Sequence, residues 1–456
     1  MAVVPLFEQA NALNMEGKYN EALNMYDQLL TQNHDNAGLL ATVGTIFMRD
    51  DARTGLAITL MEKALARGAL PKEQTSQVLS NLGLCYKNSG QPKKAIEYFK
   101  RAVDQNPTAS ALTNYGSMFV EQGNPKEAIK LLDKATKLDP TVALAHWNLS
   151  LALLEDGQWN RAWEEYEWGS APGGMRPDRT LGDKPLWDGT PGKTVAVYGE
   201  QGIGDEIMFA SMLPDILKTN DVILDCHPRL KTLFEKAFPT VRCFGTRKDA
   251  VVPWAKVEQY DYRIAIGSLG KFYRTSRDKF PGTPYLKADP MLRGARLRVG
   301  ISWTGGRLSG RVKRRTVPLS WWESILSNDC EFVSLQYTDS EPEIELVEKQ
   351  GHAIRQFAEA KAQDYYETAR LVKSCDLVIS VCTSVVHLAG ALGVPCWVMT
   401  PKRPAWRYQN SGGMPWYRSV RLYRQPEDND NAWIPVVERV GFDLSELVAS
   451  GKVKCG

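Results

Sequence analysis

The stretch "KNSGQPKKAIEYFKRAV", Lys87–Val103, establishes the architecture of the first third of the chain, because its pattern recurs. Related segments begin at residues 14, 120 and 154, and in each of them an alanine follows a glycine by five residues. The alanines of the four segments are Ala22, Ala95, Ala128 and Ala162. The last two gaps between these alanines are 33 and 34 residues, so the chain contains a regular internal repeat.

A period near 34 residues is typical of tetratricopeptide (TPR) repeats, in which each unit is a pair of helices. The longer gap between Ala22 and Ala95 contains a divergent repeat around Ala57. Each helix pair buries its small alanine only against neighbouring helices, so several units must stack. We predict a TPR α-solenoid of about five units over residues 1–169, with a protein partner on its concave face; a non-repeating helical bundle is the alternative.

The composition of the chain bears on its number of domains and on which ligands we expect. With 43% hydrophobic and 24% charged residues, the chain of 456 residues has enough core material for two or three domains. The net charge of +3 is small, so we expect no nucleic acid partner. The eight cysteines form no C-x-x-C pair, and there are only five histidines; we therefore expect reduced thiols, no metal site and no cofactor.

The sequence also bears on the location of the protein. Its first residues lack the basic start and long apolar run of a secretory signal, and no apolar stretch approaches the roughly 20 residues that span a bilayer. We expect no transmembrane segment. The predicted location is the cytoplasm, with the protein either free or peripheral at the inner face of a membrane.

A second architecture follows a Gly- and Pro-rich connector at residues 170–192, in which Trp187 is expected to anchor against one domain. Beyond it, short apolar runs alternate with helical segments; the runs are "TVAVYG", "DVILDC", "YRIAIG", "LRVGISW", "EFVSLQY", "DLVISV" and "PCWVMT". This alternation predicts parallel α/β units. We expect two Rossmann-like halves, at 193–292 and 293–456, with a ligand at the carboxyl ends of the strands; one large sheet is the alternative.

The loop "GEQGIGD", Gly199–Asp205, follows the first of these strands. Its glycine order is G-x-x-G-x-G, which differs from the dinucleotide fingerprint G-x-G-x-x-G. We expect Gly202 and Gly204 to shape the loop rather than to cradle phosphate. Asp205 stands where a helix should begin, so it is a candidate general base or a simple helix cap, and both interpretations stay open.

The segment "SVCTSVVHLAGALGVP", Ser380–Pro395, joins a predicted strand to a helix. Thr383 and Ser384 stand at the helix start, where free N–H groups and the helix dipole favour an anion. His387 lies one turn further on the same face and is a candidate donor to a phosphate or ribose. The alternative is that Thr383 and Ser384 only cap the helix and that His387 packs in the core.

A basic cluster follows another predicted strand, within the segment "SWTGGRLSGRVKRRTVPLSWW". Its cations are Arg307, Arg311, Lys313, Arg314 and Arg315. Two glycines, Gly305 and Gly306, precede the cluster and are expected to shape the loop. Arginine forks match phosphate oxygens, so we expect a diphosphate site that Ser302 and Thr304 also line. A solvated charge run and a nucleic acid surface are the alternatives.

Six motifs in order carry a family resemblance: "GEQGIGDEIMFASMLP", "VGISWTGG", "RRTVPLSWW", "FVSLQY", "DYYETARLVKSCDLVISVCTSVVHLAGALGVPCWVMTPKRPAWRY" and "PWYRSVRLYRQ". Together with the repeats, the chain resembles TPR proteins that carry a heptosyltransferase-like domain of glycosyltransferase family nine. The resemblance implies a GT-B fold of two Rossmann-like halves, with the acceptor on the first half and a nucleotide-sugar donor mainly on the second. It also implies an inverting reaction without a metal.

The resemblance assigns roles to particular residues. The family's Gly-Asp pair falls on Gly204 and Asp205, and its aspartate is the usual candidate base. Its basic residue matches Arg314 or Arg315. The donor motif D-T-S-x-x-H-x-A-G-A-L-G falls on residues 382–393, so Thr383, Ser384 and His387 would bind the donor, whereas Cys382 replaces the family's Asp.

The expected function is therefore that of a hexosyl- or heptosyltransferase. It would move a sugar from a nucleotide-sugar donor to a glycan, a lipid-linked molecule or a protein, and the repeats would dock the acceptor or a partner. The alternative is an inactive TPR scaffold that keeps a GT-B-like domain, because Cys382 departs from the family pattern.

Overall fold

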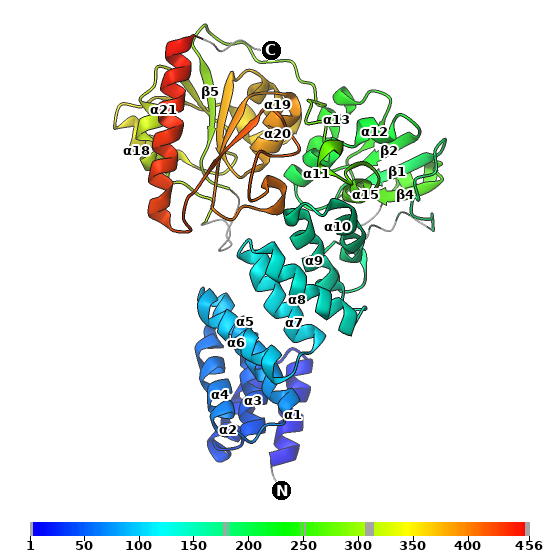
Figure 1. Cartoon of the computed structure of the whole chain (residues 1–456), viewed down its shortest axis with the longest axis vertical. Helices are drawn as coiled ribbons and strands as arrows, with labels where there is room; N and C mark the ends of the chain where they lie inside the picture. The colour runs from blue at the N-terminus through cyan, green and yellow to red at the C-terminus, as the bar shows by residue number, and fades with distance from the viewer. Residues whose placement is uncertain are drawn as a thin grey trace. The chain divides into compact units, whose positions relative to one another are not determined.

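The computed structural model describes residues 3–176, 179, 181, 183–247, 249, 252–305 and 314–451. Contacts between Cα atoms divide the chain into two compact units, Met1–Asn148 and Leu149–Gly456. The first unit is helical and the second contains all the strands (Figure 1). Each unit is described by itself below.

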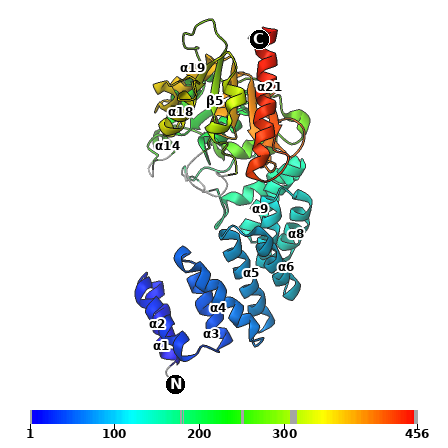
Figure 2. The ribbon, with the colours of Figure 1, turned by 90° about the vertical axis from the view of Figure 1, so that its left-hand side faces the viewer.

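The first unit consists of helix pairs, which stack one after another (Figure 2). The helices are α1 (Val3–Met15), α2 (Tyr19–Gln32), α3 (Ala37–Phe47), α4 (Thr54–Ala66), α5 (Lys72–Asn88), α6 (Pro92–Gln105), α7 (Ala109–Glu121), α8 (Pro125–Leu138) and α9 (Ala143–Asp156), the last of which continues into the second unit.

The repeat signature has a direct physical role. The repeat alanines Ala22, Ala95 and Ala128 are buried, each in the second helix of its pair. The glycines five residues before them, Gly17, Gly90 and Gly123, have positive φ, a conformation that lets the chain leave one helix and enter the next.

Close contact between the two helices of a pair also depends on glycine. A Cβ at Gly83 of α5 would lie 2.5 Å from the Phe99 ring of α6, so that position has no room for a side chain. On α6, Ala95, Phe99 and Ala102 form the buried stripe that faces the neighbouring helices. The second helix of each pair thus packs through a narrow apolar face, which explains why the pattern must recur.

The second unit contains eleven described α-helices or helical turns and ten strands. The helices that follow α9 are α10 (Trp159–Tyr166), α11 (Ile203–Ala210), α12 (Leu213–Ile216), α13 (Lys231–Ala237), α14 (Trp254–Val257), α15 (Gly270–Tyr273), α17 (Glu323–Leu326), α18 (Glu341–Glu348), α19 (Tyr365–Lys373), α20 (Ser384–Leu392) and α21 (Ile434–Ser450). The strands are β1 (Thr194–Tyr198), β2 (Asp221–Asp225), β3 (Arg242–Phe244), β4 (Tyr262–Ala265), β5 (Arg298–Ser302), β6 (Glu331–Ser334), β7 (Ile354–Arg355), β8 (Leu377–Val381), β9 (Cys396–Thr400) and β10 (Val420–Arg424).

The strands form two parallel sheets, in the orders β3-β2-β1-β4 and β10-β9-β8-β5-β6-β7. The prediction of parallel α/β architecture is confirmed, and the strands form two sheets rather than one. All seven apolar runs quoted above contain a strand. The sequence did not indicate β3, β7 and β10, which are short or carry charged residues at a sheet edge.

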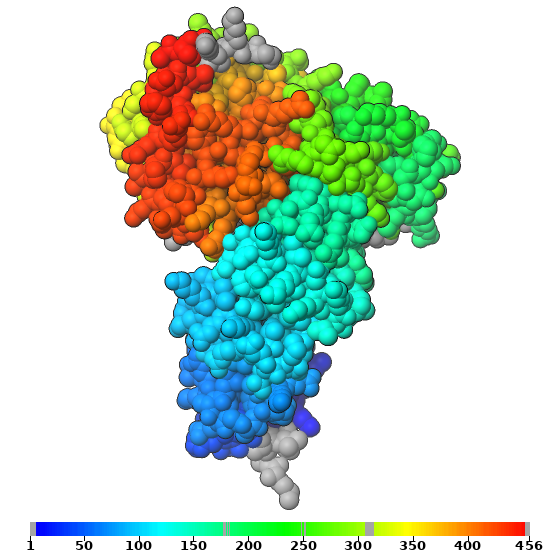
Figure 3. All heavy atoms as spheres, viewed as in Figure 1, coloured from blue at the N-terminus to red at the C-terminus, as the bar shows by residue number. Residues whose placement is uncertain are grey.

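Each sheet has a topological switch point. In the first sheet β1 lies between β2 and β4, and in the second sheet β5 lies between β6 and β8. Ligands of doubly wound sheets bind where the strand order reverses, outside the carboxyl ends of the strands. The segments after β1, β5 and β8 are those that the sequence singled out. The atoms of the first half (green) directly contact those of the second half (orange) (Figure 3).

Helix α10, which the sequence assigns to the repeat array, packs inside the second unit. The Trp163 indole N–H donates to the Arg274 carbonyl oxygen at 2.8 Å, and its ring lies so close to Gly270 that a Cβ there would approach it to 2.6 Å. Trp159 packs on Phe280, with 4.7 Å between ring centroids. The last repeat helix is therefore part of the core of the α/β unit.

The connector is also held by its aromatic residue, as predicted. Trp187 is buried, its backbone N–H donates to the Arg263 carbonyl oxygen at 3.0 Å, and its ring lies 4.7 Å from that of Phe272. Among the helices of the described ranges, none is long and apolar enough to cross a membrane.

Candidate active site

Asp205 lies in the first turn of α11, directly after β1 and its loop. Its Oδ2 atom accepts a hydrogen bond from the Gly202 N–H at 3.1 Å, and its Oδ1 atom forms an ion pair with Arg407. The N-cap residue is Gly202, so the interpretation of Asp205 as the N-cap is wrong. Asp205 instead stabilises the helix start from its third position, and the same carboxylate has a second, long-range partner.

Two of the glycines around Asp205 lie so close to neighbouring residues that a side chain would not fit. A Cβ at Gly199 would collide with the buried Glu206 carboxylate, and a Cβ at Gly204 would lie 3.2 Å from both the Ser384 Cα and the His387 ring. The left-handed turn itself falls on Gln201, at φ 61°, whereas Gly202 has an ordinary φ of −94°. Gly204 therefore lets the first half touch the start of α20 in the second half.

The start of α20 brings the predicted donor-binding hydroxyls to this contact. Thr383 is the N-cap residue, and its Oγ1 accepts from the Val385 N–H at 3.2 Å. The Ser384 hydroxyl accepts a hydrogen bond from the Tyr365 hydroxyl at 3.1 Å. The N-terminus of α20 and Asp205 thus meet across the two halves, which the sequence did not show directly.

Two arginines next to this contact are incompletely paired. Arg315 donates from Nη2 to the Gly305 carbonyl oxygen at 3.1 Å, and Arg407 pairs with Asp205. Within the described part of the chain, neither Nε atom has a hydrogen-bond partner, although both are buried. Unpaired buried donors are costly, so these two atoms indicate a place for an acceptor group.

Cys382 lies beside these arginines. Burial raises the pKa of its thiol to about 12, against the opposing effects of Arg315, Tyr408 and Arg407. The thiol is therefore neutral at ordinary pH and adds no negative charge beside the arginines. Asp205 balances the charge of Arg407.

His387 lies in the core. Its Nδ1 atom is 3.3 Å from the Tyr417 hydroxyl, and burial, with a contribution from Arg407, lowers the pKa of the imidazole to about 3. A neutral, enclosed imidazole cannot offer a positive charge to a phosphate. Its geometry matches the alternative in which His387 packs in the core and supports the loop at Gly204.

Ser302 and Thr304 bind a glutamine that the sequence did not single out. The Ser302 hydroxyl donates to Gln336 Oε1 at 3.2 Å, and the Thr304 hydroxyl lies 3.1 Å from that of Thr316. Gln336 in turn donates to the Thr304 carbonyl oxygen at 2.9 Å. These residues set the shape of the loop after β5, and Ser302 is fully buried.

The remaining predicted residues differ in their placement. Arg314 is exposed, whereas Gly305 packs under Arg315, with a Cβ there 3.0 Å from the arginine Nε. Gly306, Arg307, Arg311 and Lys313 lie outside the described residues. Of the two candidates for the family's basic residue, Arg315 is the one that points into the site.

Arg407 is the main functional candidate that sequence reasoning missed. It belongs to the motif "PKRPAWRY", which carried the resemblance, but nothing in the local pattern linked it to Asp205. Burial disfavours the charged guanidinium, yet the pKa of Arg407 is raised, chiefly because of Asp205. Its segment is tied to α9, since Gln409 donates to the Leu154 carbonyl oxygen at 3.1 Å and Asn410 donates to Glu155.

Asp225, the last residue of β2, has a structural role. Its Oδ1 accepts from the backbone N–H and the hydroxyl of Thr246, at 2.9 and 2.8 Å, and Oδ2 lies 3.1 Å from Arg179. No cluster of three or more His, Cys, Asp or Glu side chains among the described residues could hold a metal ion.

Burial of the Glu155 carboxyl predicts that the stability of the protein depends on pH. Burial raises the pKa of its carboxyl from 4.5 to about 7, so the folded state binds the proton more tightly than the unfolded state. Stability from this group is fully present below about pH 4.5 and is lost as the pH rises through about 7. We expect Glu155→Gln to be more stable than the parent at pH 8, by up to about 3 kcal/mol, and the difference to vanish near pH 4.5.

Urea unfolding followed by tryptophan fluorescence measures this effect, because twelve of the 13 tryptophans lie in the second unit. Glu164→Gln is the control, since it makes the same change at an exposed position of α10. A stability difference between Glu155→Gln and the parent that does not change with pH would contradict the assignment.

Comparison with known proteins identifies the repeats. Residues 76–108 match the family model described as tetratricopeptide repeat, and residues 116–157 match the model described as TPR repeat. The prediction of TPR repeats is thereby confirmed. Over 338 residues the chain is 30% identical to Protein FlbA of Caulobacter vibrioides; the match covers 68% of this chain and 56% of FlbA. The chain thus spans little more than half of that relative.

Several solved structures are similar to part of the chain. YrrB, described as a TPR protein with an unusual peptide-binding site, is 24% identical; the match covers 36% of this chain and 84% of YrrB, with a TM-score of 0.30. MamA is 19% identical, with coverage of 36% and 88% and a TM-score of 0.32. PilF of Pseudomonas aeruginosa is 14% identical, with coverage of 48% and 85% and a TM-score of 0.35.

Proposed function

We propose that this protein is an inverting, metal-independent glycosyltransferase of the GT-B type, which uses a nucleotide-sugar donor. The observation that carries the proposal is the meeting of three features at the switch points of the two sheets. They are the Asp205 carboxylate, the capped start of α20, and the unpaired Nε atoms of Arg315 and Arg407.

The donor diphosphate would lie between the start of α20 and the two arginines. Helix N–H groups and guanidinium forks are complementary to phosphate oxygens, and they stabilise negative charge that develops on a leaving diphosphate. Cys382 adds no negative charge to repel the diphosphate there. Thr304 and Gln336 hold the loop after β5 beside it. These groups would take the place that a metal ion has in other transferases.

Asp205 would act as the general base toward the acceptor. The acceptor oxygen forms a bond to the anomeric carbon while the bond from that carbon to the diphosphate oxygen breaks. The acceptor proton passes to Asp205, and the nucleoside diphosphate leaves with the electron pair. Because Arg407 is paired with Asp205, we propose that the donor diphosphate takes over Arg407 and frees the carboxylate.

The donor site makes a prediction for the two neighbouring arginines. We expect Arg315→Gln to weaken nucleoside diphosphate binding by about 10- to 100-fold, since a charge-assisted hydrogen bond contributes about 1.5–3 kcal/mol. Arg314→Gln removes the same charge from an exposed position and is expected to change binding less than threefold. Titration calorimetry with UDP, GDP and ADP measures both, and a larger loss for Arg314→Gln would reverse the assignment.

The reaction itself is tested by a donor screen. Thermal shift with a broad set of nucleotide sugars identifies the donor, and mass spectrometry then identifies products in the presence of candidate glycan, lipid-linked and protein acceptors. A donor that raises the melting temperature and yields a mass increase of one sugar would support the proposal. Binding that produces neither transfer nor donor hydrolysis would contradict it.

The second candidate is a TPR scaffold without catalysis. Two observations favour it: Cys382 replaces the family's Asp, and Arg407 neutralises the proposed base. TPR repeats are suited to protein docking, and in either case we propose that they hold a protein acceptor or a partner enzyme. The scaffold predicts that partner binding survives Asp205→Asn unchanged and that no donor gives product.

A further inference from the structure

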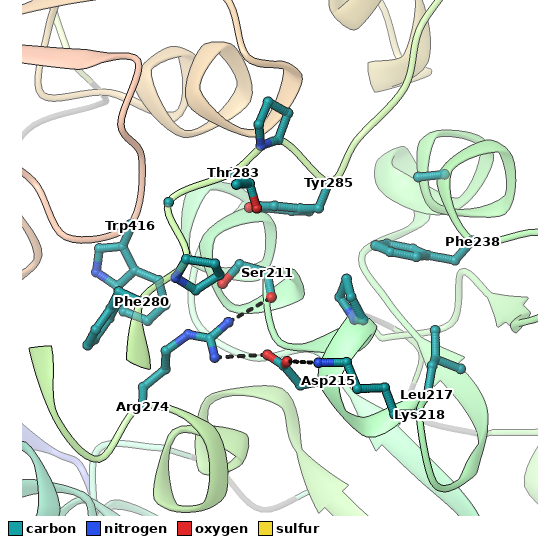
Figure 4. A pocket seen from close by; sticks show the side chains of 15 residues that line it. Ser211, Asp215, Leu217, Lys218, Phe238, Arg274, Phe280, Thr283, Tyr285 and Trp416 are labelled. Atoms are coloured by element: carbon teal, nitrogen blue, oxygen red, sulfur yellow. Dashed lines mark hydrogen bonds and ion pairs between the residues drawn. The ribbon is translucent and has the colours of Figure 1, made fainter. Parts of the chain in front are cut away.

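A cavity lies at the opposite end of the helices that form the candidate site. Its volume is about 420 Å³, and its wall includes Ser211, which directly follows α11, and Pro284, which packs against Gly393 at the end of α20 (Figure 4). Asp205 and Ser384 stand at the other ends of these two helices. At a rise of 1.5 Å per residue, the length of α11 separates Asp205 from the cavity by about 10 Å.

One wall of the cavity presents hydrogen-bond donors. The Arg274 guanidinium is 2% exposed; it donates from Nη1 to Asp215 at 2.9 Å and from Nη2 to the Ser211 carbonyl oxygen at 2.8 Å (Figure 4). In the described part of the molecule, the Arg274 Nε and the Ser211 hydroxyl have no partner although both atoms are buried. Both can donate a hydrogen bond, so an acceptor would satisfy them.

The charges of the wall favour an anion. Both carboxylate oxygens of Asp215 are already paired, Oδ1 with Lys218 and Oδ2 with Arg274, each at 2.9 Å. Two cations thus face one anion, which leaves a net positive charge among the ionisable side chains that line the cavity. A cationic ligand would find no free carboxylate there.

The other walls are apolar and largely aromatic. Phe280 and Trp416 lie on one side, and Leu217 and Phe238 lie on the other (Figure 4). Tyr285 contributes its ring, because its hydroxyl donates to the Ile207 carbonyl oxygen and lies 3.3 Å from the Tyr417 hydroxyl. Such walls suit a flat, apolar body.

We propose that this cavity is a binding site, separate from the donor site, for a small organic anion. The ligand would be a carboxylate, sulfonate or phosphate on a flat apolar body. Its acidic group would lie against the positively charged wall formed by Arg274 and Lys218, and its body would lie between the aromatic walls. A volume of about 420 Å³ is at the lower end of the range for small-molecule sites. The inference goes beyond the proposed function and does not depend on it.

The test uses the full chain and 2-naphthoate as the probe, with the neutral isostere 2-naphthamide as its matched control. Titration calorimetry should give a Kd below about 1 mM for naphthoate and at least about tenfold weaker binding for naphthamide, a difference of about 1.4 kcal/mol. Saturating UDP should leave the naphthoate Kd unchanged.

Two variants locate the bound probe. Thr283 is exposed at the wall, so Thr283→Trp should fill the cavity without disturbing the core and should abolish naphthoate binding. Lys218→Glu, at a side chain that is 71% exposed, should weaken it at least fivefold. Lys349→Glu makes the same charge change at an exposed position directly after α18 and should leave the naphthoate affinity unchanged.

The proposal would be overturned if naphthoate did not bind at 10 mM, or if naphthoate and naphthamide bound equally well. It would also be overturned if Thr283→Trp and Lys218→Glu bound naphthoate with the affinity of the parent. Displacement of the probe by UDP would place it in the donor site and would overturn the proposal as well.

Discussion

Asp205→Asn should reduce sugar transfer by about 10²- to 10⁴-fold while the protein stays folded. The size follows from the usual contribution of a general base, since the amide cannot accept the acceptor's proton. The asparagine oxygen can still accept the hydrogen bond from Gly202, so the cap of α11 is kept. Initial rates at saturating donor measure the loss, and the melting temperature checks the fold.

The matched control is Asp221→Asn, at an exposed position at the amino end of β2, which is the end of the strand away from the loop that follows β1. It should transfer sugar at the parental rate. Equal rates for Asp205→Asn and the parent would exclude Asp205 as the base and leave it with its structural role at the helix start. A loss of donor binding in Asp205→Asn would instead assign the residue to positioning Arg407.

Trp163→Ala should lower the stability of the second unit by about 3–5 kcal/mol, the usual cost of removing a buried tryptophan. The indole is fully buried, and its removal would leave a hole against Gly270 and an unpaired carbonyl oxygen at Arg274. Its ring also contacts that of Trp406, 6.1 Å away, beside Arg407. We therefore expect weaker transfer as well as lower stability.

Differential scanning calorimetry measures this effect as a fall of the second unit's transition by on the order of 10 °C. The transition of the repeat unit should stay in place, because α10 packs with the α/β unit. Tyr19→Ala removes a large aromatic ring that is 62% exposed and should shift neither transition by more than about 2 °C. A fall of the repeat transition in Trp163→Ala would show that α10 belongs to the solenoid.

Much of the fold follows from local pattern. The repeat alanines and the glycines before them are read from spacing alone, because a helix pair needs a small residue at its contact and a left-handed turn before it. The strands β1, β5 and β8 are short apolar runs that are buried on both faces. Thr383 is recognisable as a cap, because it directly precedes a helical stretch.

The site could be predicted only in part. Its loops follow strands, so the switch-point rule places Asp205 at the carboxyl ends of the strands of the first sheet, and Thr304 and Ser384 at those of the second. The role of Arg407 could not be predicted from the sequence. It lies in a loop that contains prolines, and nothing near it in the sequence indicates that it pairs with Asp205. His387 was misjudged in the opposite direction. Its place on the helix suits a contact with phosphate, but in the structure its imidazole is buried and neutral.

The sequence by itself determined the two architectures, the repeat period and the loops that carry polar residues, because these depend on neighbours within one or two turns of the chain. The tertiary structure alone decided that Arg407 pairs with Asp205 across 202 residues, that α10 packs within the α/β unit, and that a cavity lies at the C-terminal end of α11. Contacts of this kind depend on how distant elements pack, and the free energy of a buried charge or ring depends on everything that surrounds it.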